Sequence, residues 1–305
     1  MDKEDLFGAG ASALGYIYQV RYALLESLRR LRNGETDFGV SFETLDDVVF
    51  EKGCAAPDLL QTKHHVDRAA NLTDASPDLW KSIRVWAEFV TEGKVPVGTT
   101  RFLITTAKIG AGSAASYLVP GTDRDEAKAL KALRATSQSS INTTNAKAYS
   151  AFKALTAEQQ ASLMSSIRVV DVAPPMSQSL PELERELFQT AERRLVPALA
   201  VRLDSWWLGR AVRHLTIGST QAILSQELEA EIAALREQFI QDNLPIDQDI
   251  VDSHVDLAEY SGRTFIHQLE LIGLKSKRIL VRGPRLLPCI PATLTVDARG
   301  TSLRR

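Results

Sequence analysis

The chain is poor in cysteine, and this absence excludes two kinds of small stabilised domain. Its 305 residues include only two cysteines, Cys54 and Cys289. Two cysteines supply neither a disulfide framework nor a zinc cluster, so we expect the fold to depend on a hydrophobic core. Hydrophobic residues make up 44% of the chain and charged residues 24%, which is typical of a globular protein with ample core.

The sequence also lacks a long apolar run and a strong charge of one sign. No stretch approaches the roughly 18–20 apolar residues of a membrane span, and the acidic start Met1–Asp5 is unlike a signal peptide. We therefore expect a cytoplasmic protein with no membrane segment. The formal net charge of −2 argues against a generally basic, histone-like nucleic-acid binder, but it is compatible with a local basic channel.

A hairpin of two short strands is predicted within residues 41–65, SFETLDDVVFEKGCAAPDLLQTKHH. The apolar run at 48–50 predicts the first strand, and the leucine pair at 59–60 opens the second. Turn signals at Gly53 and Pro57 separate the two runs.

Polar residues occupy the ends of both predicted strands. Asp46 and Asp47 precede the first strand, whereas Gln61 and Lys63 lie two apart in the second and so project from one face. Pairing of the strands would bring an aspartate, an amide oxygen and an ammonium group to one edge of a sheet. Such oxygen ligands suit Mg²⁺, and a lysine beside them can orient a water for phosphodiester hydrolysis. The alternative is a polar-edged hairpin with a surface ion pair between Asp47 and Lys63.

This pattern resembles the PD-(D/E)xK nuclease motif in its variant with glutamine as the second acid, carried here by Asp47 and by Gln61-Thr62-Lys63. The surrounding sequence resembles the double-stranded DNA endonuclease domain of CD-NTase-associated and Lamassu-type (ABC-three-component) anti-phage effectors. Four stretches carry the resemblance: GYIYQVRYALL (15–25), LDDVVFE (45–51), LLQTKHH (59–65) and LTDASPDLWKSIRVW (72–86).

The resemblance implies a metal-dependent endonuclease that uses Mg²⁺ or Mn²⁺. The catalytic residues that it implies are Asp47, Gln61, Lys63 and, from the first helix, Gln19. For Gln19 a role in padding the contact between helix and sheet is an equally open interpretation.

The implied metal ligands are Asp47 and Gln61. Asp46 takes the place of Asp47 if its side chain is the one of the pair that points to the DNA-binding groove of the nuclease fold. Glu43 belongs to the matched block and is a further candidate ligand, although an edge charge is an open alternative. The adjacent histidines at 64–65 point to opposite faces of a strand, so we do not expect both to bind one ion.

The order of predicted elements favours the α/β class. A helix at 12–32, a strand at 38–43, the hairpin, a helix beginning at Ser76-Pro77 and a buried strand at 101–106 follow one another. This order is similar to the restriction-endonuclease-like α/β sandwich. Three helices and a short strand at 168–172 complete the predicted nuclease domain, residues 1–172.

A linker is predicted at 172–181, followed by a smaller all-helical domain over residues 181–305. We expect its helices at 181–200, 201–214 and 220–242. The adjacent Trp206 and Trp207 cannot both be buried by one helix face, which predicts one core residue and one interface residue. This domain is therefore expected to bind partners.

The stretch LDSWWLGRAV (203–212) resembles the C-terminal domain of three-component-system effectors. The resemblance implies that double-stranded DNA is the substrate and that an SMC-like ATPase and a small accessory subunit are partners. It also implies a homo-oligomer in the active state. Two rival hypotheses stay open: a catalytically inactive nuclease-fold scaffold or DNA-binding subunit, which Gln61 favours, and a sensor of a nucleotide second messenger. The size and helical character of the second domain weigh against the sensor.

Overall fold

The computed structural model describes most of the chain up to residue 239: residues 3–64, 71–96, 98–171, 173–217, 221–239, 263–264 and 267–268. The chain divides into two compact units, Met1–Ala233 and Ala234–Arg305. The first unit contains the sheet and almost all described residues. None of the described helices is long and apolar enough to cross a membrane.

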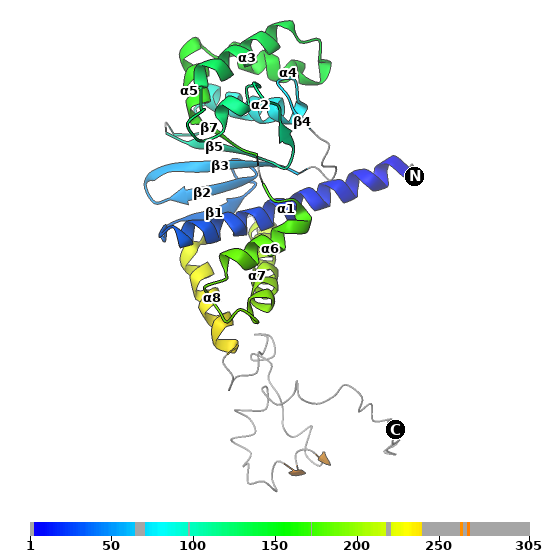
Figure 1. Cartoon of the computed structure of the whole chain (residues 1–305), viewed down its shortest axis with the longest axis vertical. Helices are drawn as coiled ribbons and strands as arrows, with labels where there is room; N and C mark the ends of the chain where they lie inside the picture. Colours follow the sequence, from blue (N-terminus) through cyan, green and yellow to red (C-terminus); the bar gives the residue numbers. More distant parts are fainter. Residues whose placement is uncertain are drawn as a thin grey trace. The chain divides into compact units, whose positions relative to one another are not determined.

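A mixed six-stranded sheet forms the centre of the first unit (Figure 1). Its strand order is β7-β5-β3-β2-β1-β8. The strands are β1 (Gly39–Phe42), β2 (Val48–Lys52), β3 (Ala55–Lys63), β5 (Thr100–Thr105), β7 (Ile167–Val170) and β8 (Ile223–Leu224). The pairs on the β1 side of β3 are antiparallel, and the pairs joining β3, β5 and β7 are parallel. Two short strands, β4 (Asn71–Leu72) and β6 (Lys108–Ile109), form a separate parallel pair. The predicted α/β class is thus confirmed.

The predicted hairpin forms between β2 and β3, with Val48 opposite Leu60. Gly53 makes the turn with a positive φ of 48°, a conformation that favours glycine. Pro57 was expected in the turn, but it lies inside β3, which begins at Ala55. The register between the strands shifts beside this proline, and such irregularities are where a strand tolerates a residue without an N–H group.

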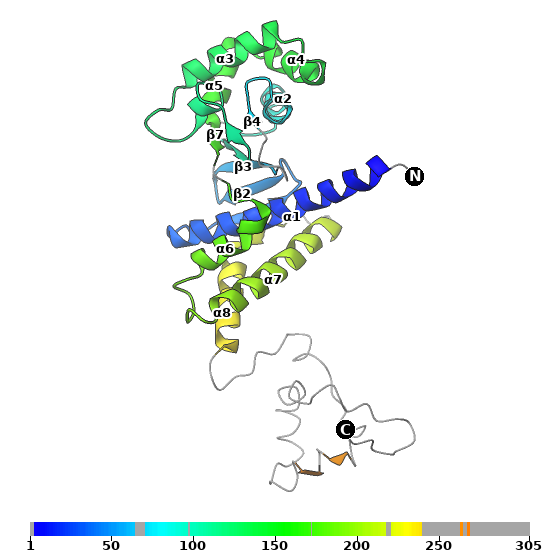
Figure 2. The same ribbon diagram turned by 45° about the vertical axis from the view of Figure 1, so that its right-hand side comes forward.

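One face of the sheet is covered by the α2 layer, which consists of four helices (Figures 1 and 2). These are α2 (Pro77–Glu92), α3 (Glu126–Ser139), α4 (Ala146–Ala154) and α5 (Ala157–Ser166). Trp80 and Trp86 are fully buried in the apolar cluster beneath them, as the sequence predicts. The predicted capping box of α5 also forms, because Thr156 and Gln159 exchange hydrogen bonds.

The other face is covered by the α1 layer, whose helices come from both ends of the unit (Figures 1 and 2). They are α1 (Lys3–Arg32), α6 (Met176–Glu186), α7 (Val196–Ile217) and α8 (Ser225–Gln238). Trp207 is buried against α1 and its Nε1 donates to the carbonyl of Val20 at 2.9 Å. Trp206 is only partly buried. One tryptophan of the pair is therefore a core residue, as expected.

The compact units differ from the predicted domains. The predicted linker at 172–181 already contains the start of α6, at Met176, and α6 and α7 pack on α1. In addition, β8 extends the sheet beside β1, where Gly39 lies so close to Ala222 that a Cβ atom on the glycine would be 2.7 Å from its side chain. Residues 173–233 therefore belong to the same unit as the sheet, because their apolar side chains cover its second face. The remainder of the predicted second domain lies largely outside the described residues.

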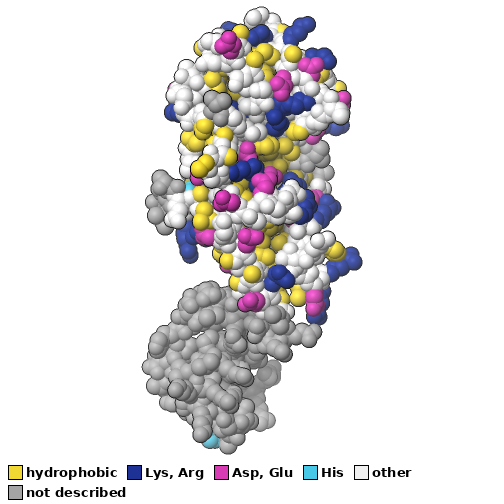
Figure 3. All heavy atoms as spheres, turned by 90° about the vertical axis from the view of Figure 1, so that its left-hand side faces the viewer, with side chains coloured by type: hydrophobic (Ala, Val, Ile, Leu, Met, Phe, Trp, Pro, Cys, Tyr) yellow, Lys and Arg dark blue, Asp and Glu magenta, His cyan; other side chains and the backbone are white. Residues whose placement is uncertain are grey.

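Charged side chains of both signs are interspersed on the face of the molecule shown in Figure 3. A largely buried ion-pair network lies at the hairpin of the first unit. Arg30 of α1 pairs with Asp58 of β3 at 2.8 Å, and Lys52 of β2 pairs with the same carboxylate at 3.2 Å. This network ties α1 to the sheet.

Candidate functional site

The candidate site lies in the loop between β1 and β2, where β3 ends. Asp47, the last residue of that loop, has one carboxylate oxygen, Oδ2, that accepts a hydrogen bond from the backbone N–H of Thr62 at 2.9 Å. Thr62 stands between Gln61 and Lys63 in β3. The hairpin therefore brings Asp47 beside the Gln61–Lys63 segment. The second carboxylate oxygen of Asp47 makes no hydrogen bond to the residues that the structure describes.

Gln61 supplies an acceptor that has no partner. Its side chain is buried and acts to lower the pKa of Asp46, whereas its Oε1 atom has no hydrogen-bond partner among the described residues. An unsatisfied buried polar atom costs about 1–3 kcal/mol, so such atoms are rare unless a ligand uses them. The amide oxygen is thus available to a cation.

Asp46 connects the site to the α2 layer by a hydrogen bond. Its Oδ1 accepts from the backbone N–H of Asp47 at 3.0 Å, and its Oδ2 accepts from Nε1 of Trp86 at 2.8 Å. Burial raises the pKa of Asp46 from 3.8 to about 6, although the hydrogen bonds from Trp86 and Gln61 act in the opposite direction. Both oxygens are occupied, so Asp46 is less suited than Asp47 to hold a ligand.

Gln19 fixes the loop from the α1 side. Its Nε2 donates to the backbone carbonyl of Asp47 and, at 3.1 Å, to Oε1 of Glu43. Glu43 has a φ of 52°, which is unusual for a residue other than glycine, and its N–H donates to the same carbonyl of Asp47 at 3.3 Å. A strained backbone of this kind costs on the order of 1–3 kcal/mol and clusters at functional sites. Gln19 therefore holds the loop in shape, and the carboxylate of Glu43 is exposed beside it.

Lys63 is partly exposed, and its ammonium group makes no hydrogen bond or ion pair to any described residue. The alternative of a surface ion pair between Asp47 and Lys63 is thus not formed. The ammonium group lies on the strand that carries Gln61, two residues further along and on the same face. It is available for an anionic ligand.

His64 contacts other groups of the protein. Nε2 of His64 accepts from the N–H of Met176 at 3.4 Å, and its ring lies 4.5 Å from the ring of Tyr18. His65 lies outside the described residues. In the part of the chain that is described, no three His, Cys, Asp or Glu side chains are grouped so as to hold a metal. A metal in this site would be held by Asp47 and Gln61, with backbone oxygens and water. Such an all-oxygen set fits Mg²⁺ or Mn²⁺.

Two buried residues of the site were not found from the sequence. Trp86 was expected only as a core residue, but its indole N–H holds Asp46. Arg101 of β5 is also buried, and burial lowers its pKa to about 10 while the charge of Asp46 raises it. Both interactions with Asp46, the hydrogen bond of Trp86 and the electrostatic effect on Arg101, join residues 40 or more positions apart, and no local sequence pattern predicts them.

Comparison with known proteins finds no match to this chain, either among protein-family models or among curated proteins.

Proposed function

We propose that the chain is a Mg²⁺- or Mn²⁺-dependent endonuclease that cuts double-stranded DNA and has a restriction-endonuclease-like sandwich. The observation that carries the proposal is the meeting of Asp47 with the Gln61–Lys63 segment, where one buried amide oxygen and one ammonium group have no partner. The resemblance to the PD-(D/E)xK motif at these same residues supports it. So does the central sheet, in which the hairpin is antiparallel and the neighbouring strands are parallel.

In this proposal some residues of the site bind the metal and others position the water or the loop. Asp47 and Gln61 would hold the metal through oxygen atoms, with Glu43 as a further carboxylate at the edge of the loop. A bound divalent cation would neutralise charge on the scissile phosphate and make a bound water more acidic. Lys63 would position the attacking water and balance the charge on the phosphate. Gln19 and Asp46 would keep the loop in place from the two layers.

We further propose that the enzyme acts in the cytoplasm as an effector of anti-phage defence. In this proposal an SMC-like ATPase and a small accessory subunit restrain it until foreign DNA is sensed. The resemblance of residues 203–212 to three-component effectors supports these partners. A homo-oligomer in the active state would supply one active site for each strand of the duplex.

The decisive experiment compares Lys63→Ala with the wild type in cleavage of a supercoiled plasmid. With Mg²⁺ or Mn²⁺ and its partners, the wild type should nick or linearise the plasmid, and Lys63→Ala should lose at least about 100-fold in rate. Its free energy of unfolding should stay within about 1 kcal/mol, because this lysine is not a core residue. Lys147→Ala, which removes an exposed lysine of α4, is the matched control and should cleave normally. Equal cleavage by Lys63→Ala and the wild type would contradict the assignment.

Metal binding provides an independent measurement. Calorimetry should show that Asp47→Asn loses Mn²⁺ binding and that His64→Ala keeps it. Gln61→Glu should bind Mn²⁺ more tightly, because it adds a negative charge at the same place. The reverse pattern, with binding lost in His64→Ala and kept in Asp47→Asn, would place the metal elsewhere.

One rival function has an observation in its favour. Gln61 stands where an acid would complete the metal site, and the described residues contain no cluster of three acidic or histidine ligands. Both facts suit an inactive nuclease fold that serves as a scaffold or DNA-binding subunit. In that case the wild type should bind duplex DNA in EDTA and should not cleave it with any metal or partner.

A further inference from the structure

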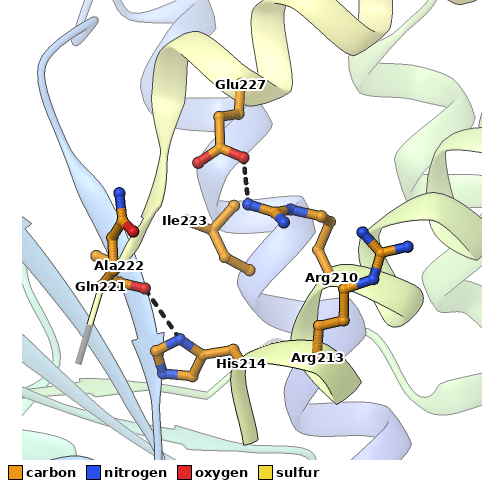
Figure 4. Close-up of a pocket in the computed structure, with 7 residues that line it drawn as sticks. All are labelled: Arg210, Arg213, His214, Gln221, Ala222, Ile223 and Glu227. Carbon is orange, nitrogen blue, oxygen red and sulfur yellow. Dashed lines mark hydrogen bonds and ion pairs between the residues drawn. The ribbon is translucent and has the colours of Figure 1, made fainter. Parts of the chain in front are cut away.

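A pocket of about 480 Å³ lies in the α1 layer, apart from the residues of the candidate site (Figure 4). Its walls come from the C-terminal half of α7, from residues that lead into β8, and from the first turn of α8. The lining residues that matter for its chemistry are Arg210, Arg213, His214, Ala222, Ile223 and Glu227.

The pocket has more positive than negative charge. Arg210 pairs with Glu227 through Nη2, whereas its Nε atom is buried and has no hydrogen-bond partner. Arg213 is exposed, and its guanidinium group makes no hydrogen bond or ion pair to the described part of the chain. The lining of the pocket therefore carries two guanidinium groups and one carboxylate, of which only Arg210 and Glu227 are paired. The exposed guanidinium group of Arg213, with the charge of Arg210 in the same lining, suits an anion with several oxygen atoms.

His214 lines the pocket and is fixed by two hydrogen bonds to the backbone. Its Nε2 accepts from the backbone N–H of Phe42 at 3.3 Å, so the proton of the ring is on Nδ1, which donates to the carbonyl of Gln221 at 3.2 Å. Both ring nitrogens are thus engaged by backbone groups of the protein. Recognition of an anion in this pocket falls to the two arginines.

The wall beside the arginines is apolar. Ala222 and Ile223 are buried and contribute their side chains to it. A volume of about 480 Å³ is larger than a bare phosphate ion and lies in the range of small-molecule sites. The pocket therefore combines a basic end with an apolar wall.

We propose that this pocket binds a small organic phosphate, with the phosphate on Arg210 and Arg213 and the organic part against Ala222 and Ile223. A phosphate group offers three acceptor oxygens and up to two negative charges to the guanidinium groups, whereas a carboxylate offers two oxygens and one charge. The proposal does not depend on nuclease activity, since no residue of the pocket belongs to the candidate site.

The test is isothermal titration calorimetry of the full chain with three probes: phenyl phosphate, inorganic phosphate and benzoate. Phenyl phosphate should bind about tenfold more tightly than inorganic phosphate, because it also buries an apolar ring, and more tightly than benzoate, which carries one charge. Arg213→Gln should weaken phenyl phosphate at least about tenfold. This arginine is exposed, so its replacement should not perturb folding.

Two variants keep the result interpretable. Arg193→Gln removes the same charge from an exposed residue outside the pocket and should bind phenyl phosphate like the wild type. Arg213→Lys keeps the charge but loses the planar fork, so its affinity should be intermediate. The proposal is overturned if no probe binds, if Arg213→Gln binds like the wild type, if Arg193→Gln weakens binding equally, or if benzoate or inorganic phosphate binds as well as phenyl phosphate.

Discussion

The two layers that cover the sheet are built in different ways. The α2 layer comes from one continuous stretch of chain, and its contact with the sheet is a single apolar cluster that includes Trp80, Trp86 and Phe152. The α1 layer is assembled from both ends of the compact unit. Its apolar contacts are supplemented by polar ones between distant residues, such as the ion pair of Arg21 with Asp204 at 2.7 Å.

The candidate site depends on both layers. Trp86 of the α2 layer holds Asp46, and Gln19 of the α1 layer holds the loop that ends at Asp47. Hydrophobic burial is non-directional, whereas hydrogen bonds and ion pairs fix geometry. Both layers thus position the loop by hydrogen bonds, the α2 layer through Trp86 and the α1 layer through Gln19.

The largest expected effect comes from removing the C-terminal part of the α1 layer. A chain that ends at Asp171 loses α6, α7, α8 and β8, and it exposes the face of α1 that now packs on Leu199, Leu203 and Trp207. We expect it to lose the cooperative unfolding transition of the first unit, measured by calorimetry. A chain that ends at Gln238 keeps these elements and should keep the transition. Identical transitions for the two chains would show that residues 173–233 form a separate domain after all.

A pair of tryptophan substitutions compares burial in the two layers. Trp80→Ala should destabilise the protein by about 3–5 kcal/mol, because the ring is fully buried and packs edge-on against Tyr149 at 4.5 Å. Trp206→Ala should cost less than about 1 kcal/mol, because that ring is only partly buried. Both values follow from urea denaturation. A larger loss for Trp206→Ala would mean that the α1 layer depends on it as a core residue.

The sequence predicts the α2 layer and the hairpin better than the α1 layer. Helix signals at Ser76-Pro77 and Thr156 are local, and α2 and α5 begin where these signals place them. The β-strand pattern around Val48 and Leu60 also predicts which residues of the hairpin are opposite each other. Local patterns report local hydrogen bonds, so these elements could be found.

Contacts across the α1 layer could not be found in this way. Nothing in the local pattern of Ile223 and Leu224 indicates that they pair with β1, about 185 positions earlier along the chain. In the candidate site, the proximity of Asp47 to the segment after Gln61 follows from the predicted hairpin. The hydrogen bond from Trp86 to Asp46 does not follow from any predicted element. The role of that tryptophan depends on how a helix docks on the sheet, which is a tertiary property.

A pH-dependent measurement addresses the one place where a buried carboxylate meets the α2 layer. The pKa of Asp46 is about 6 in the folded protein and 3.8 ordinarily. Because the folded value is the higher one, its contribution to stability is fully present below pH 3.8 and is lost as the pH rises through about 6. The difference corresponds to about 3 kcal/mol.

Asp46→Asn should remove this contribution. The free energy of unfolding, measured by urea denaturation between pH 4.5 and 7.5, should then fall less steeply with pH than in the wild type. Asp123→Asn changes an exposed carboxylate and should leave the slope unchanged. If Asp46→Asn has the slope of the wild type, Asp46 is not the buried group that titrates.

The smallest expected effect concerns the polar contacts of the α1 layer. Arg21 and Asp204 form two parallel hydrogen bonds between α1 and α7, of 2.8 and 2.7 Å, and both side chains are about 20% exposed. A double-mutant cycle with alanine at each position should give a coupling energy of about 1 kcal/mol, because the pair is bidentate and partly shielded from water.

The matched control is the pair of Arg84 and Glu88, which lies on the surface of α2 and is more exposed. Its coupling should be smaller than about 0.5 kcal/mol after solvent screening. Raising the salt concentration should weaken both couplings and should weaken the exposed pair more. A coupling near zero for Arg21 and Asp204 would mean that apolar packing alone fastens the α1 layer. The two layers would then differ in their order along the chain and not in the forces that hold them.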